Sequence, residues 1–170
     1  MKKIIINDNN LKDEDIEKKV IRVKALIINS NNKILLAHNN NTFQFPGGHK
    51  EDNETLEECI KREIKEETGI DLEITEEPFL NITTYDNNYF LTGKKVLNTI
   101  YYYCIYTNEK PNFDNTHYDE LEIQTDFNLF YVNLSNFSSF LQKNISSSKI
   151  DEKIGREMKI VYNEYNEIHN

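Results

Sequence analysis

The segment formed by residues 55–67 restricts the fold of this chain more than any other feature. It contains neither Gly nor Pro, and Gly69 follows it closely, so we expect a helix that ends near this glycine. On a helical wheel of ~100° per residue, the apolar side chains share one arc: Leu56, Cys59, Ile60 and Ile64. A helix with one apolar face needs a sheet or another helix to cover that face, which indicates a layered domain.

The segments around this helix show the alternation of β-strands. From Val20 to Ile27, apolar residues alternate with Arg22 and Lys24, which predicts a strand with one buried face. A turn at 30–32 and a returning strand at 33–38 complete a hairpin. We predict further strands at 72–75, 79–85, 95–106 and 128–133. The segment 96–106 is apolar or aromatic on both faces, which suits a central strand.

The two ends of the chain differ from this pattern. Residues 11–19 are polar and predict a short surface helix or turn. After a serine-rich linker at 146–148, apolar residues recur at spacings of four and three, as in an amphipathic helix: Ile150, Ile154, Met158, Val161, Tyr165 and Ile168. We therefore divide the chain into an N-terminal segment (1–19), a domain (20–145) and a C-terminal helix packed on it (149–170). The predicted fold class is α+β, and a homodimer contact through the last helix is the alternative role for that helix.

Composition excludes several classes of protein. The 170 residues carry a formal net charge of −9, which argues against non-specific binding to nucleic acid or anionic membranes. A phosphorylated substrate stays compatible with this charge, since a bound divalent metal can reverse the local sign. Two cysteines, Cys59 and Cys104, cannot form a disulfide framework, and no apolar run is long enough to cross a membrane. The N-terminus turns polar too soon for a signal peptide, so we expect a soluble, cytoplasmic protein.

Three carboxylates make the end of the central helix unusual. Glu63, Glu66 and Glu67, spaced i, i+3 and i+4, fall on the arc that should meet the core. Their mutual repulsion, their desolvation and their place near a helix C-terminus are all unfavourable unless cations offset them. Arg62 alone cannot neutralise three anions, and hard oxygen ligands suit Mg²⁺, with Mn²⁺ as an alternative. A helix end that happens to be acidic is the competing interpretation.

The surrounding segment resembles a known family. From Gly48 to Ile70 the chain is similar to the Nudix box, Gly-x5-Glu-x7-Arg-Glu-U-x-Glu-Glu-x-Gly-U, where U is aliphatic. All its fixed positions are filled: Gly48, Glu54, Arg62, Glu63, Ile64, Glu66, Glu67, Gly69 and Ile70. The resemblance extends over roughly residues 20–140. It implies an α/β/α sandwich with a mixed sheet, and Mg²⁺-dependent hydrolysis of a pyrophosphate linkage in a nucleoside diphosphate joined to another moiety.

The resemblance also implies roles for individual residues. Glu63, Glu66 and Glu67 match the family's metal ligands, and we count Glu66 with the catalytic residues as well. Glu54 matches an additional carboxylate that binds a further metal or positions water, and Arg62 matches the residue that orients the glutamates. Some family members take their general base from a later loop. Glu120 and Glu122 are our candidates there, and ordinary loop charges are the equally weighted alternative.

Four residues are candidate contacts to the substrate. Gly48 matches a turn position of the box, and His49 lies in the loop before the box helix. Tyr85 lies where many Nudix proteins hold the nucleobase, and Lys95 precedes the central strand, where it can meet a phosphate. For each, an ordinary loop or strand residue is the competing interpretation.

The identity of the substrate stays open. A nucleoside triphosphate, a dinucleoside polyphosphate and a nucleotide sugar are all compatible with the sequence. Pro78 lies too close to the box to match the proline of ADP-ribose hydrolases, whereas Tyr85 is a weak indication of dinucleoside polyphosphates. A non-catalytic, nucleotide-sensing Nudix domain is the alternative from another class, and the intact box glutamates favour the enzyme.

Overall fold

The computed structural model describes residues 1–39, 42–89, 92–118 and 127–169. Its strands are β1 (Lys2–Ile6), β2 (Lys18–Ile28), β3 (Lys33–Asn39), β4 (Thr42–Gln44), β5 (Leu80–Asp86), β6 (Val96–Tyr106) and β7 (Asn128–Asn133). Its α-helices are α1 (Leu56–Thr68), α3 (Phe137–Ser146) and α4 (Glu152–His169), and short 3-10 turns form at η1 (Asp13–Asp15), η3 (Phe113–Asn115) and η4 (Leu134–Asn136).

The strands form one mixed sheet. Its order is β1-β5-β6-β2-β3-β4, and β7 pairs with β3. The pairs β1–β5 and β2–β6 are parallel, and the other pairs are antiparallel. The central place of β6, between β5 and β2, confirms the prediction drawn from its apolar character on both faces.

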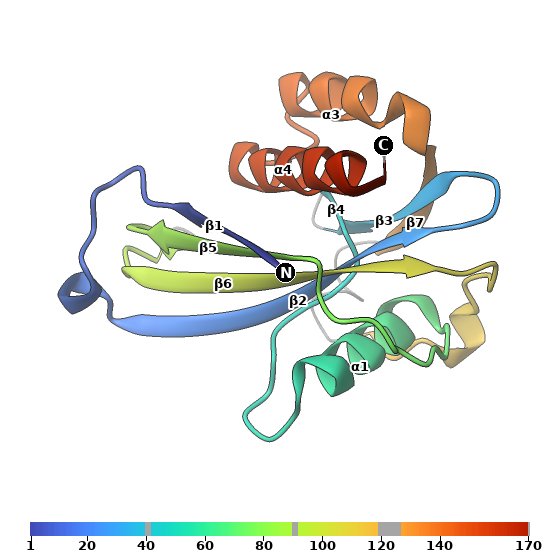
Figure 1. The fold of residues 1–170 in the computed structure, drawn as a ribbon, viewed down its shortest axis with the longest axis horizontal. Helices are drawn as coiled ribbons and strands as arrows, with labels where there is room; N and C mark the ends of the chain where they lie inside the picture. Colours follow the sequence, from blue (N-terminus) through green and yellow to red (C-terminus); the bar gives the residue numbers. More distant parts are fainter. Residues whose placement is uncertain (40–41, 90–91, 119–126, 170) are drawn as a thin grey trace.

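Helices cover both faces of this sheet. Figure 1 shows α1 on one side and the pair α3 and α4 on the other. Each interface contains its own apolar core, because alternate residues of a strand point to opposite faces. Ile60 and Ile64 of α1 pack against Val23 and Ile27, while Met158 and Val161 of α4 pack in the core that contains Leu26 and Tyr102. The predicted α+β class, with a mixed sheet between helices and a C-terminal helix, is confirmed.

The ends of α1 follow from local signals in the sequence. The Thr55 hydroxyl caps the N-terminus by accepting a hydrogen bond from the Glu58 backbone N–H at 3.1 Å, and the Glu58 carboxylate accepts a hydrogen bond from the Thr55 backbone N–H at 2.7 Å. Gly69 ends the helix in the left-handed conformation, with φ of 67°. The helix thereby begins and ends within one residue of the predicted bounds, 55 and 67.

One predicted strand is wrong, and three elements were not predicted. The segment 72–75 forms no strand; its alternation instead places Ile74 and Leu72 against the core beneath α1. β1 lies in the N-terminal segment 1–19, where the sequence predicts a short helix or turn at 11–19 but no strand, and β4 and α3 are not predicted either. β4 has only three residues, and α3 contains polar residues in most of its positions.

The polar face predicted for β2 is also wrong in part. Lys24 is only 2% exposed, although alternation with Val23 and Ala25 had placed it towards solvent. The face that carries Lys24 also carries Leu26 and Ile28, and it lies beneath the layer of α3 and α4. The strand is therefore covered on both faces over much of its length.

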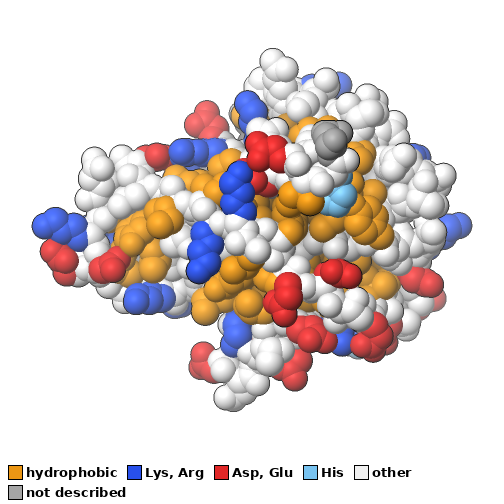
Figure 2. Space-filling model, in the orientation of Figure 1, with side chains coloured by type: hydrophobic (Ala, Val, Ile, Leu, Met, Phe, Trp, Pro, Cys, Tyr) orange, Lys and Arg blue, Asp and Glu red, His pale blue; other side chains and the backbone are white. Residues whose placement is uncertain are grey.

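Charge is unevenly distributed on the surface. In the view of Figure 2, acidic side chains gather over α1 and the chain next to it. Among the described residues, no helix combines the length and the apolar character that crossing a bilayer requires.

Candidate active site

The guanidinium group of Arg62 gathers three carboxylates around it. It donates two hydrogen bonds to Glu54, from Nε at 3.0 Å and from Nη2 at 2.7 Å. Its Nη1 donates to Glu63 at 2.9 Å and to Glu66 at 3.0 Å. The backbone carbonyl of His49 accepts a further bond from Nη2 at 3.0 Å. One planar cation thus fixes the position of three side chains and of the preceding loop.

This arrangement changes the proton affinity of its members. The hydrogen bonds from Arg62 lower the pKa of Glu54 to about 2, and the same bonds raise the pKa of Arg62 above its ordinary value. Glu54 is therefore ionised throughout the neutral range. A carboxylate of such low basicity is a weak proton acceptor, so Glu54 is better suited to orienting Arg62 than to general-base catalysis.

Glu67 lies one helical position further and is held differently. It is only 4% exposed, and its carboxylate accepts a hydrogen bond of 2.9 Å from the Gly47 backbone N–H. A buried carboxylate near a helix C-terminus is unfavourable by itself, because both desolvation and the helix dipole act against it. The burial of Glu67 therefore indicates a functional site in which a cation offsets its charge, and not an ordinary core position.

Two glycines allow the loop to come this close to the glutamates. A Cβ atom on Gly48 would overlap the carboxylate of Glu63, and a Cβ on Gly47 would overlap the backbone carbonyl of Val23. Gly47 also has φ of +133°, a conformation that other residues rarely adopt. Glycine is therefore required at position 47 by the backbone, whereas a side chain at position 48 would displace the carboxylate of Glu63.

The donor set has the chemistry of a divalent-cation site. Glu54, Glu63, Glu66 and Glu67 supply hard oxygen atoms on one side of α1, and three of them already surround a positive charge, that of Arg62. Within the described residues, no group of three or more His, Cys, Asp or Glu side chains forms a ready metal-binding cluster. The residues thus fit a metal by chemistry and by charge, while their present orientation is set by Arg62.

The predicted substrate contacts lie at different distances from this cluster. His49 adjoins it through the carbonyl that binds Arg62, and the His49 ring lies 3.3 Å from the Tyr89 hydroxyl. Tyr85 instead donates a hydrogen bond of 2.7 Å to Asp13, and Lys95 lies 3.5 Å from Asp15. Tyr85 and Lys95 are thus both engaged with the segment around η1.

The predicted general bases, Glu120 and Glu122, lie outside the described residues. Their assignment stays a prediction.

Sequence reasoning missed two basic residues that lie near the cluster. Lys24 of β2 is buried, and the negative charge of Glu67 acts on it, opposing the lowering of its pKa by burial. Arg22 lies two positions earlier on the same face of β2. The sequence contained one signal for the burial of Lys24. Leu26 and Ile28 follow it on the same face of the strand, and two apolar residues there indicate that a second layer covers this face.

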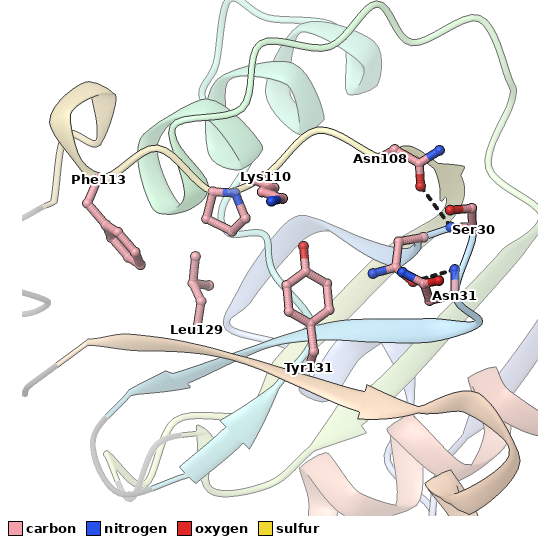
Figure 3. Close-up of a pocket in the computed structure, with 9 residues that line it drawn as sticks. Ser30, Asn31, Asn108, Lys110, Phe113, Leu129 and Tyr131 are labelled. Atoms are coloured by element: carbon pink, nitrogen blue, oxygen red, sulfur yellow. Dashed lines mark hydrogen bonds between the residues drawn. The ribbon is translucent and has the colours of Figure 1, made fainter.

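A separate hollow lies at the far end of the β2–β3 hairpin. It measures about 580 Å³, and Figure 3 shows Leu129 and Tyr131 rising from β7 towards the chain that carries Lys110 and Phe113. Asn108 accepts a hydrogen bond of 2.9 Å from the Ser30 backbone N–H at its border. None of the residues that line it belongs to the carboxylate cluster.

Comparison with known proteins agrees with this architecture. The sequence model of the NUDIX domain matches residues 18–129. The chain is 35% identical over 77 residues to the 8-oxo-dGTP diphosphatase of Proteus vulgaris, covering 41% of this chain and 67% of that protein. It is 51% identical over 49 residues to the ADP-ribose pyrophosphatase of Methanocaldococcus jannaschii, covering 26% of this chain and 29% of that protein.

The fold has a counterpart among solved structures. The MutT protein from Methanosarcina mazei Go1 superposes with a TM-score of 0.58 at 22% identity, over 89% of this chain and 98% of that one. At this identity the likeness concerns the fold alone.

Fold and cluster together define a layered α+β domain with an acidic helix end held by one arginine. The chain belongs to the NUDIX family, whose model matches more than half of it. The predicted resemblance is confirmed, and so, at the level of the family, is the predicted class of hydrolase acting on phosphoric anhydrides.

Proposed function

We propose that this protein is a metal-dependent pyrophosphohydrolase that cleaves a phosphoric anhydride in a nucleoside diphosphate derivative. The observation that carries the proposal is the carboxylate cluster of α1, in which Arg62 gathers Glu54, Glu63 and Glu66 beside a buried Glu67. Membership in a family whose relatives are named as diphosphatases and pyrophosphatases supports it.

Glu63, Glu66 and Glu67 are the residues that would hold Mg²⁺ or Mn²⁺. When bound, such a cation offsets the charge of the diphosphate and lowers the pKa of water. Arg62 orients Glu63 and Glu66 through hydrogen bonds from its Nη1, and the Gly47 N–H orients Glu67. Cleavage of an anhydride depends mainly on position and on electrostatic stabilisation, which are what a fixed set of carboxylates supplies.

The substrate we propose is a small nucleotide. The relatives bear names that refer to 8-oxo-dGTP and ADP-ribose, which share a nucleoside joined to a diphosphate. A nucleoside triphosphate, a dinucleoside polyphosphate and a nucleotide sugar all contain this unit. A cytoplasmic location and a homodimer stay predictions.

The proposal is tested by assaying a panel of these nucleotides with Mg²⁺ and identifying the products. We expect release of a nucleoside monophosphate from at least one compound, with activity lost on addition of a chelator. Glu67→Gln should abolish turnover and greatly weaken Mg²⁺ binding in titration calorimetry, because it removes one charged ligand.

Glu57→Gln is the matched control. Glu57 lies on the same helix but pairs with Lys61 at 3.0 Å, on the side away from the cluster, so this variant should keep wild-type activity. Full activity in Glu67→Gln would overturn the proposed mechanism. Nucleotide binding without turnover by the wild type would instead indicate a sensing domain.

The general base is tested separately. Glu120→Gln or Glu122→Gln should lower kcat by a factor of roughly 10²–10⁴ if that residue accepts the proton, with Mg²⁺ affinity unchanged. Full activity in both variants would place the base elsewhere in the chain.

A further inference from the structure

β7 forms an outer edge of the sheet. It pairs with β3 without a bulge, from Lys33 opposite Asn133 to His38 opposite Asn128. On its other side, no strand of the described residues pairs with it. Such an edge strand carries backbone N–H and C=O groups that point away from the sheet and can pair with a further strand.

One hydrogen bond shows which residues of β7 direct their backbone groups outward. The Leu134 N–H donates to the Asn32 carbonyl at 2.8 Å, and in an antiparallel pair every second residue faces the same partner. The residues between, which are Leu129, Tyr131 and Asn133, therefore face the free edge. Within the part of the chain that the structure describes, the backbone groups of Leu129 and Tyr131 have no hydrogen-bond partner.

β7 lacks the features with which proteins protect an exposed edge. Lysine, proline, a bulge or a very short strand discourages pairing with another chain. β7 reads Asn-Leu-Phe-Tyr-Val-Asn, without a charged residue or a proline, in a chain in which 29% of the residues are charged. By contrast, β1 at the opposite edge begins with Lys2 and Lys3, and β4 has only three residues. β7 is thus the long edge that is open to a further strand.

Two aromatic side chains of β7 are exposed, one on each face of the strand. Phe130 is 43% exposed and Tyr131 is 41% exposed, and neighbouring residues of a strand point to opposite faces. Tyr131 and Leu129 point into the hollow of about 580 Å³ that Phe113 also lines (Figure 3). On the other face, Phe130 lies beside Phe43, with ring centroids 5.4 Å apart. The hollow leaves room beside Tyr131 for the side chains of an added strand.

A second copy of this chain is complementary to this edge. A two-fold axis at Tyr131 places this residue opposite Tyr131 of the partner subunit, and it places Phe130 opposite Val132 of the partner subunit. Leu129 then lies opposite Asn133 of the partner subunit, so all the outward-facing residues take part. Cross-strand pairs of two aromatic residues, or of an aromatic and a β-branched residue, are favourable, and no like charges meet in this register.

We infer that β7 is an interaction surface through which two copies of this protein pair edge to edge and continue the sheet across a two-fold axis. The inference goes beyond the proposed function and is independent of it, because no residue of β7 belongs to the carboxylate cluster. An isologous contact of this kind closes on itself, so it produces a dimer and not a filament. A strand of six residues forms an interface below the standard size, so we expect a dissociation constant of roughly 1–100 µM.

Sedimentation of the full chain over a range of about 1 µM to 1 mM measures this dimer directly. The wild type should change from monomer to dimer over the range. Tyr131→Lys should weaken association at least about tenfold, because two like charges then lie opposite each other at the two-fold axis. Tyr131→Phe keeps the aromatic pair and should associate as the wild type does.

Two proline variants distinguish the free side of β7 from the side that pairs with β3. Tyr131→Pro removes a backbone N–H that faces outward, so it should abolish the dimer, while the monomer tolerates proline at an edge. Val132→Pro removes an N–H that faces β3, so its melting temperature should fall much further than that of Tyr131→Pro. Melting curves at a concentration where the wild type is monomeric make this comparison.

Two control variants place the same charge on exposed apolar residues elsewhere. Ile5 of β1 is 71% exposed at the opposite edge of the sheet, and Ile168 of α4 is 58% exposed. Ile5→Lys and Ile168→Lys should both associate as the wild type does, because neither residue lies in the proposed contact.

A wild type that remains monomeric at about 1 mM would overturn the inference. A dimer that persists in both Tyr131→Lys and Tyr131→Pro would overturn it as well. Loss of the dimer in Ile168→Lys, with Tyr131→Lys still dimeric, would place the contact on the last helix instead of on β7.

Discussion

At the scale of single residues, Arg62 is the group on which the geometry of the cluster depends. It contacts Glu54 through two nitrogens and shares a third nitrogen between Glu63 and Glu66. Lysine could supply the charge at this position but not the planar set of donors. Arg62 acts through the glutamates and is therefore a positioning residue.

Arg62→Ala should lower kcat by a factor of about 10–100, which is less than the loss in Glu67→Gln, because this variant disturbs the orientation of the carboxylates but removes none of them. Arg62→Lys should recover only part of this loss. The measurement is kcat and KM at saturating Mg²⁺, together with the Mg²⁺ affinity of each variant. If Arg62→Ala is as inactive as Glu67→Gln at saturating metal, Arg62 does more than orient the glutamates.

Single residues also show where sequence reasoning reaches its limit. The glutamates of α1 could be predicted, because their i, i+3 and i+4 spacing is local. The burial of Lys24 could not, because the layer that covers it contains α4, which begins at Glu152. Alternation along β2 shows which residues share a face of the strand, but it does not show whether a second layer covers the other face.

At the scale of elements, local chemistry made α1 predictable. Thr55 and Glu58 form the capping box, and Gly69 ends the helix. β1 had no such signal, because it gains its order from parallel pairing with β5, where Lys2 lies opposite Leu80. The strand predicted at 72–75 is wrong because the signal was ambiguous. Alternating apolar residues are found in a strand, and they are found equally in an extended loop that packs against a core.

The capping box and the Arg62 cluster make the stability of the α1 region depend on pH. The pKa of Glu54 is lowered to about 2 by Arg62, and that of Glu58 is lowered by the Thr55 backbone N–H. Because both folded-state values lie below the ordinary value of 4.5, the stabilisation is complete above about pH 4.5 and is lost as the pH falls towards 2.

We therefore expect the urea midpoint of unfolding to fall between pH 5 and pH 3. Glu54→Gln removes the larger of the two shifts, so its midpoint should fall less steeply over the same range. The measurement is a series of urea titrations followed by circular dichroism. Parallel curves for the wild type and Glu54→Gln would show that the pairing with Arg62 adds no stability.

At the scale of the whole molecule, the two ends of the chain meet over the sheet. Lys2 of β1 donates a hydrogen bond of 2.7 Å to Glu164 of α4, and Lys153 contacts both oxygens of Asp86 at 2.9 Å. Figure 1 shows α4 above β1 and β5, on the face of the sheet opposite α1. The layer of α3 and α4 that covers this face of the sheet is thus built from parts of the chain beyond residues 18–129, which the family model matches.

The carboxylate cluster should also link the stability of the whole domain to metal. Three carboxylates share the Arg62 guanidinium and the Glu67 carboxylate is buried beside them, so the native state contains repulsion that a bound cation would relieve, whereas the unfolded chain has no such site. Mg²⁺ at about a hundred times its dissociation constant should add ~2.7 kcal/mol to the free energy of unfolding, which raises the melting temperature by about 5–10 °C in a domain of this size.

The measurement is a melting curve with chelator and with millimolar Mg²⁺, at an ionic strength matched with NaCl so that general screening of the net negative charge is the same in both. Glu67→Gln should show a much smaller shift than the wild type. Equal melting temperatures of the wild type in the two solutions would contradict a metal site formed by these glutamates in the native state.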